Sequence, residues 1–278
     1  MKKIEKKAYA KVNLMLRVIG KRLDGYHDLQ MVNAKIDLYD TVTLCTNDTS
    51  QVRVVFDKEF AIQNNIVEKI IYDLKNRYRI NDGITVYINK RIPIASGMAG
   101  GSADAAAVIH LMDNRYNLNL SFKEKQVLGL KYGADIPYML IDDLAIVEGI
   151  GEVITSVPDK LSKEVLIVNP NFPVSTKEIF QNVSSFSSSL GHAYIYDAIK
   201  AGKVELLLQN DLMNVVEKSY PELRKIVNEL KIITDKPVFM TGSGPTLVVL
   251  LNNEIEETKL NEFKNKYSDI YIQKHKII

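Results

Sequence analysis

The chain has 278 residues, of which 46% are hydrophobic and 25% are charged, and its 36 basic residues nearly balance 34 acidic ones. This length predicts two domains of about 100–150 residues each, and the composition is ordinary for a soluble globular protein. A formal charge of +2 gives no reason to expect nucleic acid or an anionic membrane surface as a partner.

The single cysteine, Cys45, excludes an internal disulfide framework and a multi-cysteine metal site, and it fits a reducing cytoplasm. It lies in the apolar stretch TVTLC, which favours a buried thiol over a reactive one. The four histidines lack ligand spacing, so we expect no dedicated side-chain metal cluster. The basic N-terminal stretch is interrupted by polar residues, and no stretch reaches about 18 apolar residues, so we expect neither a signal peptide nor a membrane span.

Hydrophobic periodicity predicts the order of the elements. In the first half these are a strand over 10–20, a helix over 67–78, a strand over 84–90 and a helix from about 102. The next helix is opened by the capping box of Ser121 and Glu124 and ended by Gly133. A strand–turn–strand follows over 144–155. In the second half they are a strand over 164–170, a helix over 221–230, two strands around a glycine turn over 238–251, a helix over 257–267 and a strand over 270–277. The hydrophobic pattern is interrupted near residues 158–163, which predicts a domain boundary there, with domains over 1–158 and 159–278. The order of the elements predicts mixed α+β layers.

The stretch IPIASGMAGGSADAAAV, residues 92–108, joins a strand to an alanine-rich helix through several glycines. Backbone N–H groups at a helix start have no partner within the helix and suit a phosphate. Gly97, Gly100 and Gly101 would let the backbone approach such a ligand closely, and Ser102 would act as helix cap and as a hydroxyl aimed at phosphate or its metal. The stretch matches neither the Walker A nor the G-x-G-x-x-G pattern, and a purely structural glycine loop is the alternative.

Three other stretches carry polar residues in unusual places. Lys11 and Asn13 share one face of the first strand, although such residues usually face solvent. Asp135 stands before a proline-led helical turn, where a simple helix cap is the alternative. The glycine turn Gly242–Gly244 separates two apolar strands, and a simple turn is the alternative there.

Taken together, these stretches resemble the GHMP kinase superfamily. PIASGMAGGSADAAA resembles its phosphate loop, and MTGSGPT resembles its C-terminal glycine motif. Within the superfamily, AKVNLML with GKRLDGYHDLQMV, GADIPYML and VEGIGEVI resemble the members that phosphorylate a sugar alcohol bearing cytidine diphosphate in non-mevalonate isoprenoid biosynthesis. The resemblance runs from about residue 7 to 249. It implies a two-domain α+β fold, with an N-terminal domain like domain 2 of ribosomal protein S5, a ferredoxin-like C-terminal domain and the active site in the cleft between them.

The resemblance also implies ATP and Mg²⁺ as cofactors and a catalytic pair. Asp135 would accept the proton of the attacking hydroxyl, and Lys11 would keep that carboxylate ionised. The residues implied for ATP are Asn65, Pro93, Ala95, Ser96, Gly97, Met98, Ala99, Gly100, Gly101 and Ser102. Ser102 would be the side chain offered to Mg²⁺.

For the acceptor substrate, the resemblance implies a pocket for the cytosine base. Tyr26 and Phe180 would stack on its two faces and His27 would hydrogen-bond its edge. The residues implied for this substrate are Asn13, Tyr26, His27, Thr176, Phe180, Gly242, Ser243 and Gly244.

The chain departs from the family pattern in the phosphate loop. Ala95, Ser96 and Ala99 stand where the family often has glycine, and Ala103 stands where it has a second serine. Asp104 is expected in the first helical turn, pointing away from the phosphates. Two other functions stay open: a homoserine- or mevalonate-type kinase of the superfamily, and a catalytically silent nucleotide-binding sensor. We expect a monomer or a homodimer with small-molecule partners only.

Overall fold

The computed structural model describes residues 3–57, 65–251 and 257–278, which form two compact units. The first unit draws on the segments up to Ala10, Leu38–Ile94 and Ala99–Asp142, and the second on Lys11–Asp37, Ala95–Met98 and Asp143–Ile278. Long strands β1 (Ile4–Lys21) and β2 (His27–Asn47) contribute residues to both units. Among the described residues, no helix combines the length and the apolar character that a membrane span requires.

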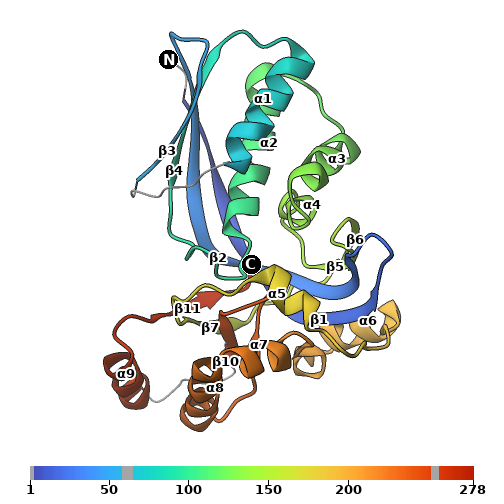
Figure 1. Cartoon of the computed structure of the whole chain (residues 1–278), viewed down its shortest axis with the longest axis vertical. Coiled ribbons are helices and arrows are strands. Elements are labelled where there is room, and N and C mark those ends of the chain that lie inside the picture. The colour runs from blue at the N-terminus through green and yellow to red at the C-terminus, as the bar shows by residue number, and fades with distance from the viewer. Residues whose placement is uncertain (1–2, 58–64, 252–256) are drawn as a thin grey trace. The chain divides into compact units, whose positions relative to one another are not determined.

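The first unit places helices against a β-sheet (Figure 1). The end of β2 pairs antiparallel with β4 (Gly83–Asn89), which in turn pairs parallel with β3 (Val52–Phe56). The helices are α1 (Ile66–Tyr78), α2 (Gly100–Tyr116), α3 (Phe122–Tyr132) and α4 (Ile136–Met139). Helix α2 contacts each of the other three and buries most of its alanine and aliphatic side chains, as its composition predicts.

Local sequence signals account for most helix ends in this unit. The capping box of Ser121 and Glu124 opens α3 and Gly133 caps its end, as predicted. The predicted start of α2 is wrong by two residues, because the helix begins at Gly100 after Ala99, which adopts a left-handed conformation (φ 59°). Ser102 is therefore the third residue of α2 and not its cap.

The second unit contains a four-stranded antiparallel sheet with the strand order β11-β7-β10-β9. The strands are β7 (Glu164–Asn169), β9 (Val238–Met240), β10 (Leu247–Leu251) and β11 (Tyr271–Lys276), and the helices between them are α8 (Pro221–Thr234) and α9 (Glu257–Lys266). The chain order β7-α8-β9-β10-α9-β11 is that of a ferredoxin-like domain. The mixed α+β fold class and this domain type are therefore confirmed.

A second group of strands and helices completes this unit. Strand β1 pairs parallel with β8 (Gln209–Asn210), and β2 pairs antiparallel with β5 (Ala145–Gly149), which pairs with β6 (Val153–Ser156). The short helices that follow β7 are α5 (Thr176–Gln181), α6 (His192–Lys200), the 3₁₀ helix η1 (Val204–Leu207) and α7 (Met213–Ser219). Strand–turn–strand 144–155 is confirmed by β5 and β6.

Candidate active site

Lys11 and Asn13 lie on β1 inside the second unit. Their side chains are 2% and 0% exposed, so the solvent-facing alternative is wrong. The Lys11 ammonium donates a hydrogen bond to Asn13 Oδ1 at 2.7 Å. A buried ammonium needs such partners, because an unsolvated charge is costly.

The Asn13 side chain is held by a network that joins three parts of the second unit. Its Oδ1 also accepts hydrogen bonds from the Thr241 hydroxyl (3.1 Å) and the Gly242 N–H (2.7 Å), and its Nδ2 donates to Asn33 Oδ1 (2.6 Å). Three donors on one amide oxygen occupy its lone pairs. Through these hydrogen bonds Asn13 fixes the position of the Lys11 ammonium and of the glycine turn. Neither Asn33 nor Thr241 was singled out from the sequence, because no local pattern marks either residue as a partner of Asn13.

The two glycine motifs touch each other within the second unit. Gly97 (φ 75°) and Gly242 (φ 58°) both adopt left-handed conformations. A Cβ atom at residue 97 would lie 2.4 Å from the carbonyl oxygen of Thr241, and one at residue 242 would lie 2.7 Å from the carbonyl oxygen of Gly97. Only glycine allows this approach. Beside the turn, the hydroxyls of Thr176 and Ser243 are 2.7 Å apart.

Residues 100–102 form the first turn of α2 in the first unit. The N–H groups of a first turn have no acceptor within the helix. A Cβ atom at Gly101 would meet no atom within 4 Å, so packing does not explain this glycine. The open space beside it leaves room for a phosphate on the helix start.

Two departures from the family loop fall on left-handed backbone. Ala95 has φ 51° and Ala99 has φ 59°. This conformation costs a non-glycine residue about 1–2 kcal/mol. The segment 93–99 therefore holds strain at two positions that glycine would relax.

Asp135 stands at the N-cap position of α4, directly after the Gly133 cap of α3 and Ala134. Its carbonyl oxygen accepts the N–H of Met139 at 3.1 Å, but its carboxylate makes no capping hydrogen bond to the helix. The alternative of a side-chain cap is therefore wrong. The carboxylate is not used to begin α4.

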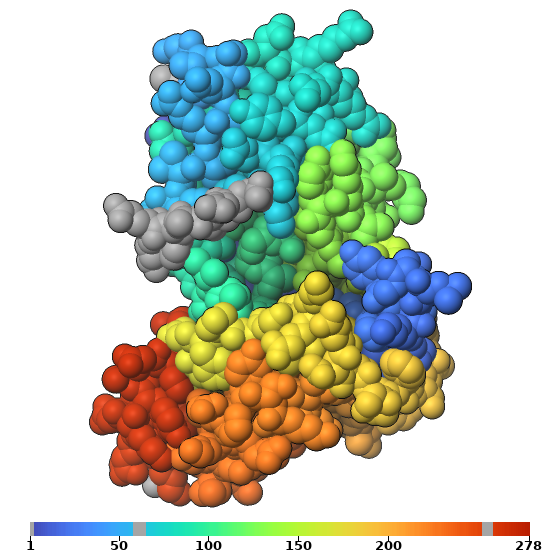
Figure 2. Space-filling view, in the orientation of Figure 1, coloured from blue at the N-terminus to red at the C-terminus, as the bar shows by residue number. Residues whose placement is uncertain are grey.

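Two of the three aromatic side chains predicted to hold the cytosine base are in contact, and their roles in binding stay predictions. The ring of His27, 7% exposed at the start of β2, lies 5.2 Å from that of Phe180 on α5 and 6.3 Å from that of Phe186. Tyr26 is 58% exposed in the preceding turn, which stands on the surface beside the segment containing α5 (Figure 2). The ring that contacts Phe180 is thus that of His27. Burial, and then Lys21, lowers the pKa of His27, so its ring is neutral at pH 7.

Beneath the start of α2, the first unit buries three charged side chains together. The Lys90 ammonium pairs with Asp104 Oδ2 at 2.7 Å and with Asp40 Oδ2. Asp104 is the fifth residue of α2, so its expected place in the first turn is wrong. Burial raises the pKa of Asp104 to about 7, against the opposing effect of Lys90. Neither Lys90 nor Asp40 was singled out from the sequence.

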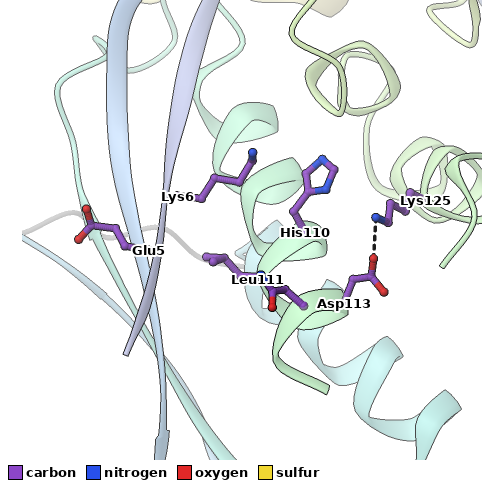
Figure 3. Close-up of a pocket in the computed structure, with 7 residues that line it drawn as sticks. Glu5, Lys6, His110, Leu111, Asp113 and Lys125 are labelled. Atoms are coloured by element: carbon purple, nitrogen blue, oxygen red, sulfur yellow. Dashed lines mark ion pairs between the residues drawn. The ribbon is translucent and has the colours of Figure 1, made fainter. Parts of the chain in front are cut away.

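A pocket of about 420 Å³ in the first unit contains none of the predicted site residues. It lies along the second half of α2, as Figure 3 shows. Its lining residues are Glu5, Lys6, His110, Leu111, Asp113, Asn114 and Lys125. His110 Nε2 lies 3.1 Å from the Leu140 carbonyl oxygen, and burial lowers the pKa of this histidine.

Metal-binding side chains do not cluster in the described part of the chain: no group of three His, Cys, Asp or Glu could hold an ion there. Ser102, the residue expected to offer its hydroxyl to Mg²⁺, is the third residue of α2, and that role stays a prediction. Asn65 caps α1, where its Oδ1 accepts the N–H of Val67 at 2.9 Å. Cys45 is buried, as predicted.

Comparison with known proteins shows which protein family the chain belongs to. The family model of the GHMP kinases N terminal domain matches residues 65–145, and that of the GHMP kinases C terminal domain matches residues 195–269. The two matches lie on either side of residue 158, where the predicted domain boundary stays a prediction. Solved structures share the fold, among them homoserine kinase from Cytophaga hutchinsonii, with a TM-score of 0.66, 18% identity, and coverage of 100% of this chain and 95% of that one.

Other relatives narrow the class further. A 4-diphosphocytidyl-2-C-methyl-D-erythritol kinase from Clostridium perfringens is 36% identical over 96% of both chains. One from Thermoanaerobacter pseudethanolicus is 37% identical over 99% of this chain and 96% of its own. The crystal structure of a 4-(cytidine 5'-diphospho)-2C-methyl-D-erythritol kinase matches with a TM-score of 0.81 and 24% identity, over 98% of this chain and 99% of that one. The chain belongs to the GHMP kinases and, among them, to the 4-diphosphocytidyl-2-C-methyl-D-erythritol kinase family.

Proposed function

We propose that the protein transfers the γ-phosphoryl group of ATP to the 2-hydroxyl of 4-diphosphocytidyl-2-C-methyl-D-erythritol. The products would be the 2-phosphate and ADP, in the non-mevalonate route to isoprenoid precursors. The similarity over 96% of both chains to a kinase named for this substrate carries the choice of acceptor. The structures of a homoserine kinase and a mevalonate kinase share the fold with this chain, but each is only 18% identical to it in sequence.

The nucleotide phosphates would be held by the segment from Pro93 to Ser102. The open space at Gly101 supports this role, because the helix start can then donate backbone N–H groups to a phosphate. When bound, Mg²⁺ would neutralise charge on the phosphates, with the Ser102 hydroxyl as the side chain offered to it. Asn65 already caps α1, so its adenine-side role would use groups other than the capping oxygen.

The acceptor hydroxyl would be activated by Asp135 and Lys11. Asp135 would take the proton of the hydroxyl as it attacks, and the positive charge of Lys11 would favour the ionised carboxylate. Asn13 would orient the Lys11 ammonium through the 2.7 Å hydrogen bond. Phosphoryl transfer requires mainly positioning and charge neutralisation, which these residues would supply.

The cytosine base would be recognised beside α5. Phe180 and the neutral ring of His27 lie together there, and the exposed Tyr26 would close over the base from the preceding turn. Base–aromatic stacking contributes about 1–3 kcal/mol. Thr176 and the turn Gly242–Gly244 would face the remainder of the acceptor. The buried thiol of Cys45 supports a reducing, cytoplasmic setting.

A turnover assay tests the proposal. The purified protein with Mg-ATP is offered the cytidyl substrate, mevalonate and homoserine in parallel, and ADP release is followed. We expect turnover on the cytidyl substrate alone. Turnover on mevalonate or homoserine would identify another kinase of the superfamily, and nucleotide binding without turnover would favour a sensor.

Asp135→Ala tests the mechanism in the same assay. We expect kcat to fall by about 10²–10⁴-fold, the usual contribution of a general base, with ATP affinity within a few-fold of wild type. Asp73→Ala is the control, because this carboxylate of the first unit pairs with Lys131 at 2.8 Å. Loss of ATP binding by the Asp135 variant would show a structural role instead.

A further inference from the structure

Lys90 and Asp40 fix the chain just before the phosphate loop. Asp40 is fully buried in β2, and its Oδ1 accepts the backbone N–H groups of Arg91 (2.6 Å) and Ile92 (2.8 Å). Its Oδ2 pairs with the Lys90 ammonium. The residues that lead into the loop are therefore held by a charge-assisted set of hydrogen bonds, which are stronger than neutral ones.

The same ammonium fixes the chain just after the loop. Lys90 Nζ pairs with Asp104 of α2 at 2.7 Å. It also lies against the first turn of this helix, because a Cβ atom at Gly100 would come within 3.4 Å of Nζ. Lys90 directly follows β4, and its ammonium contacts the neighbouring strand β2 and the start of α2. The N–H groups of this helix start are the ones proposed to hold phosphate.

Stability alone gives a poor account of this cluster. Its three side chains are at most 7% exposed, and two carboxylates share one cation. Within the described residues, Asp104 Oδ1 is buried without a hydrogen-bond partner. Apolar residues of similar volume often stabilise a protein as well as a buried ion cluster does. The cluster does, however, define one arrangement of the strand end and the helix start.

We propose that Lys90 is a positioning residue for the nucleotide, which sets the affinity for the ATP phosphates by fixing both ends of the segment 93–99. This inference rests on the proposed function, because it takes that segment and the start of α2 as the phosphate-binding element. Lys90 would act through the backbone that it holds and not by touching the phosphates.

The test compares nucleotide affinities of charge variants by calorimetric titration with the magnesium complex of adenylyl imidodiphosphate. Lys90→Met removes the cation but leaves two buried carboxylates, so the double variant Lys90→Met/Asp104→Leu is made as well to retain a folded protein. We expect each folded variant to bind the nucleotide roughly 10- to 100-fold more weakly, the effect of a small misplacement of binding groups. Backbone amides of residues 99–103 should exchange hydrogen faster, and the KM for the acceptor should stay within about two-fold of wild type.

A second ion pair on the same helix provides the matched control. Asp113 of α2 pairs with Lys125 of α3 at 2.6 Å, as the dashed line in Figure 3 shows. Lys125→Met/Asp113→Leu should leave nucleotide affinity within two-fold, and Lys90→Arg should restore most of it.

Two results would overturn the inference: wild-type affinity in the folded Lys90→Met/Asp104→Leu variant, or an equal loss in the control pair. The titration needs no acceptor. A wild-type protein that binds the nucleotide but leaves the cytidyl substrate unphosphorylated would therefore contradict the proposed function, while the comparison of affinities would still decide the role of Lys90.

Discussion

The amide oxygen of Asn13 accepts the Lys11 ammonium at 2.7 Å and, on its other side, the N–H of Gly242 at 2.7 Å. One fully buried side chain thereby ties the proposed catalytic lysine to the C-terminal glycine motif. Lys11 and this motif are far apart in the sequence, yet they share one polar network.

Asn13→Leu should lower kcat by about 100-fold, because the lysine loses the group that orients it. The KM for ATP should change little. The control is Asn169→Leu, since Asn169 is also buried in the second unit and donates to Thr246 at 2.7 Å. Both variants should lose stability by about 1–3 kcal/mol through buried groups left unpaired. Steady-state kinetics and thermal melting separate the two effects, and equal kcat values in the two variants would contradict the role of Asn13.

Ala99→Gly should stabilise the protein by up to about 1 kcal/mol, because glycine relieves the left-handed strain at φ 59° at some cost in unfolded-state entropy. Urea denaturation measures the change. Ala105→Gly, inside helix α2, which Ala99 precedes, should instead destabilise the protein by about 1 kcal/mol. A destabilised Ala99→Gly variant would show that the methyl group itself makes a needed contact.

The raised pKa of Asp104, about 7, makes stability depend on pH in a defined direction. Between its ordinary value near 3.8 and about 7, the folded protein binds more protons than the unfolded chain, so this group's contribution to stability falls as pH rises through that interval. Melting temperatures across this range should show the fall, and Asp104→Asn should flatten it. Asp113 has a lowered pKa, so Asp113→Asn should remove a contribution of the opposite sign, one that is lost as pH falls. An unchanged pH profile in Asp104→Asn would contradict the assignment.

Phe180→Ala should raise the KM for the cytidyl substrate by roughly 10-fold, as the loss of one stacking face predicts, with the KM for ATP unchanged. Phe172→Ala is the matched control, because its ring stacks on Tyr220 at 5.5 Å elsewhere in the second unit. His27→Ala should resemble Phe180→Ala, since the two rings are in contact. If the Phe172 variant raised this KM as much as the Phe180 variant, base recognition would not lie beside α5.

The local features of this fold were predictable from the sequence. The capping box of α3, the alanine-rich α2 and the two glycine motifs all depend on residues close together in the chain. The partners of Asn13 and of Asp104 were not predictable, because they come from distant strands whose register no local pattern sets. The contact between the rings of His27 and Phe180 was not predictable for a related reason. His27, the first residue of β2, is enclosed, whereas Tyr26 lies in the turn before the strand and is exposed.

The contact between Gly97 and Gly242 limits which sequence changes the two glycine loops can accept. Neither Gly97 nor Gly242 has room for a Cβ atom, because the backbone of the other loop lies against it. An insertion or a bulkier residue in one would displace the other, so the two motifs must change together or not at all.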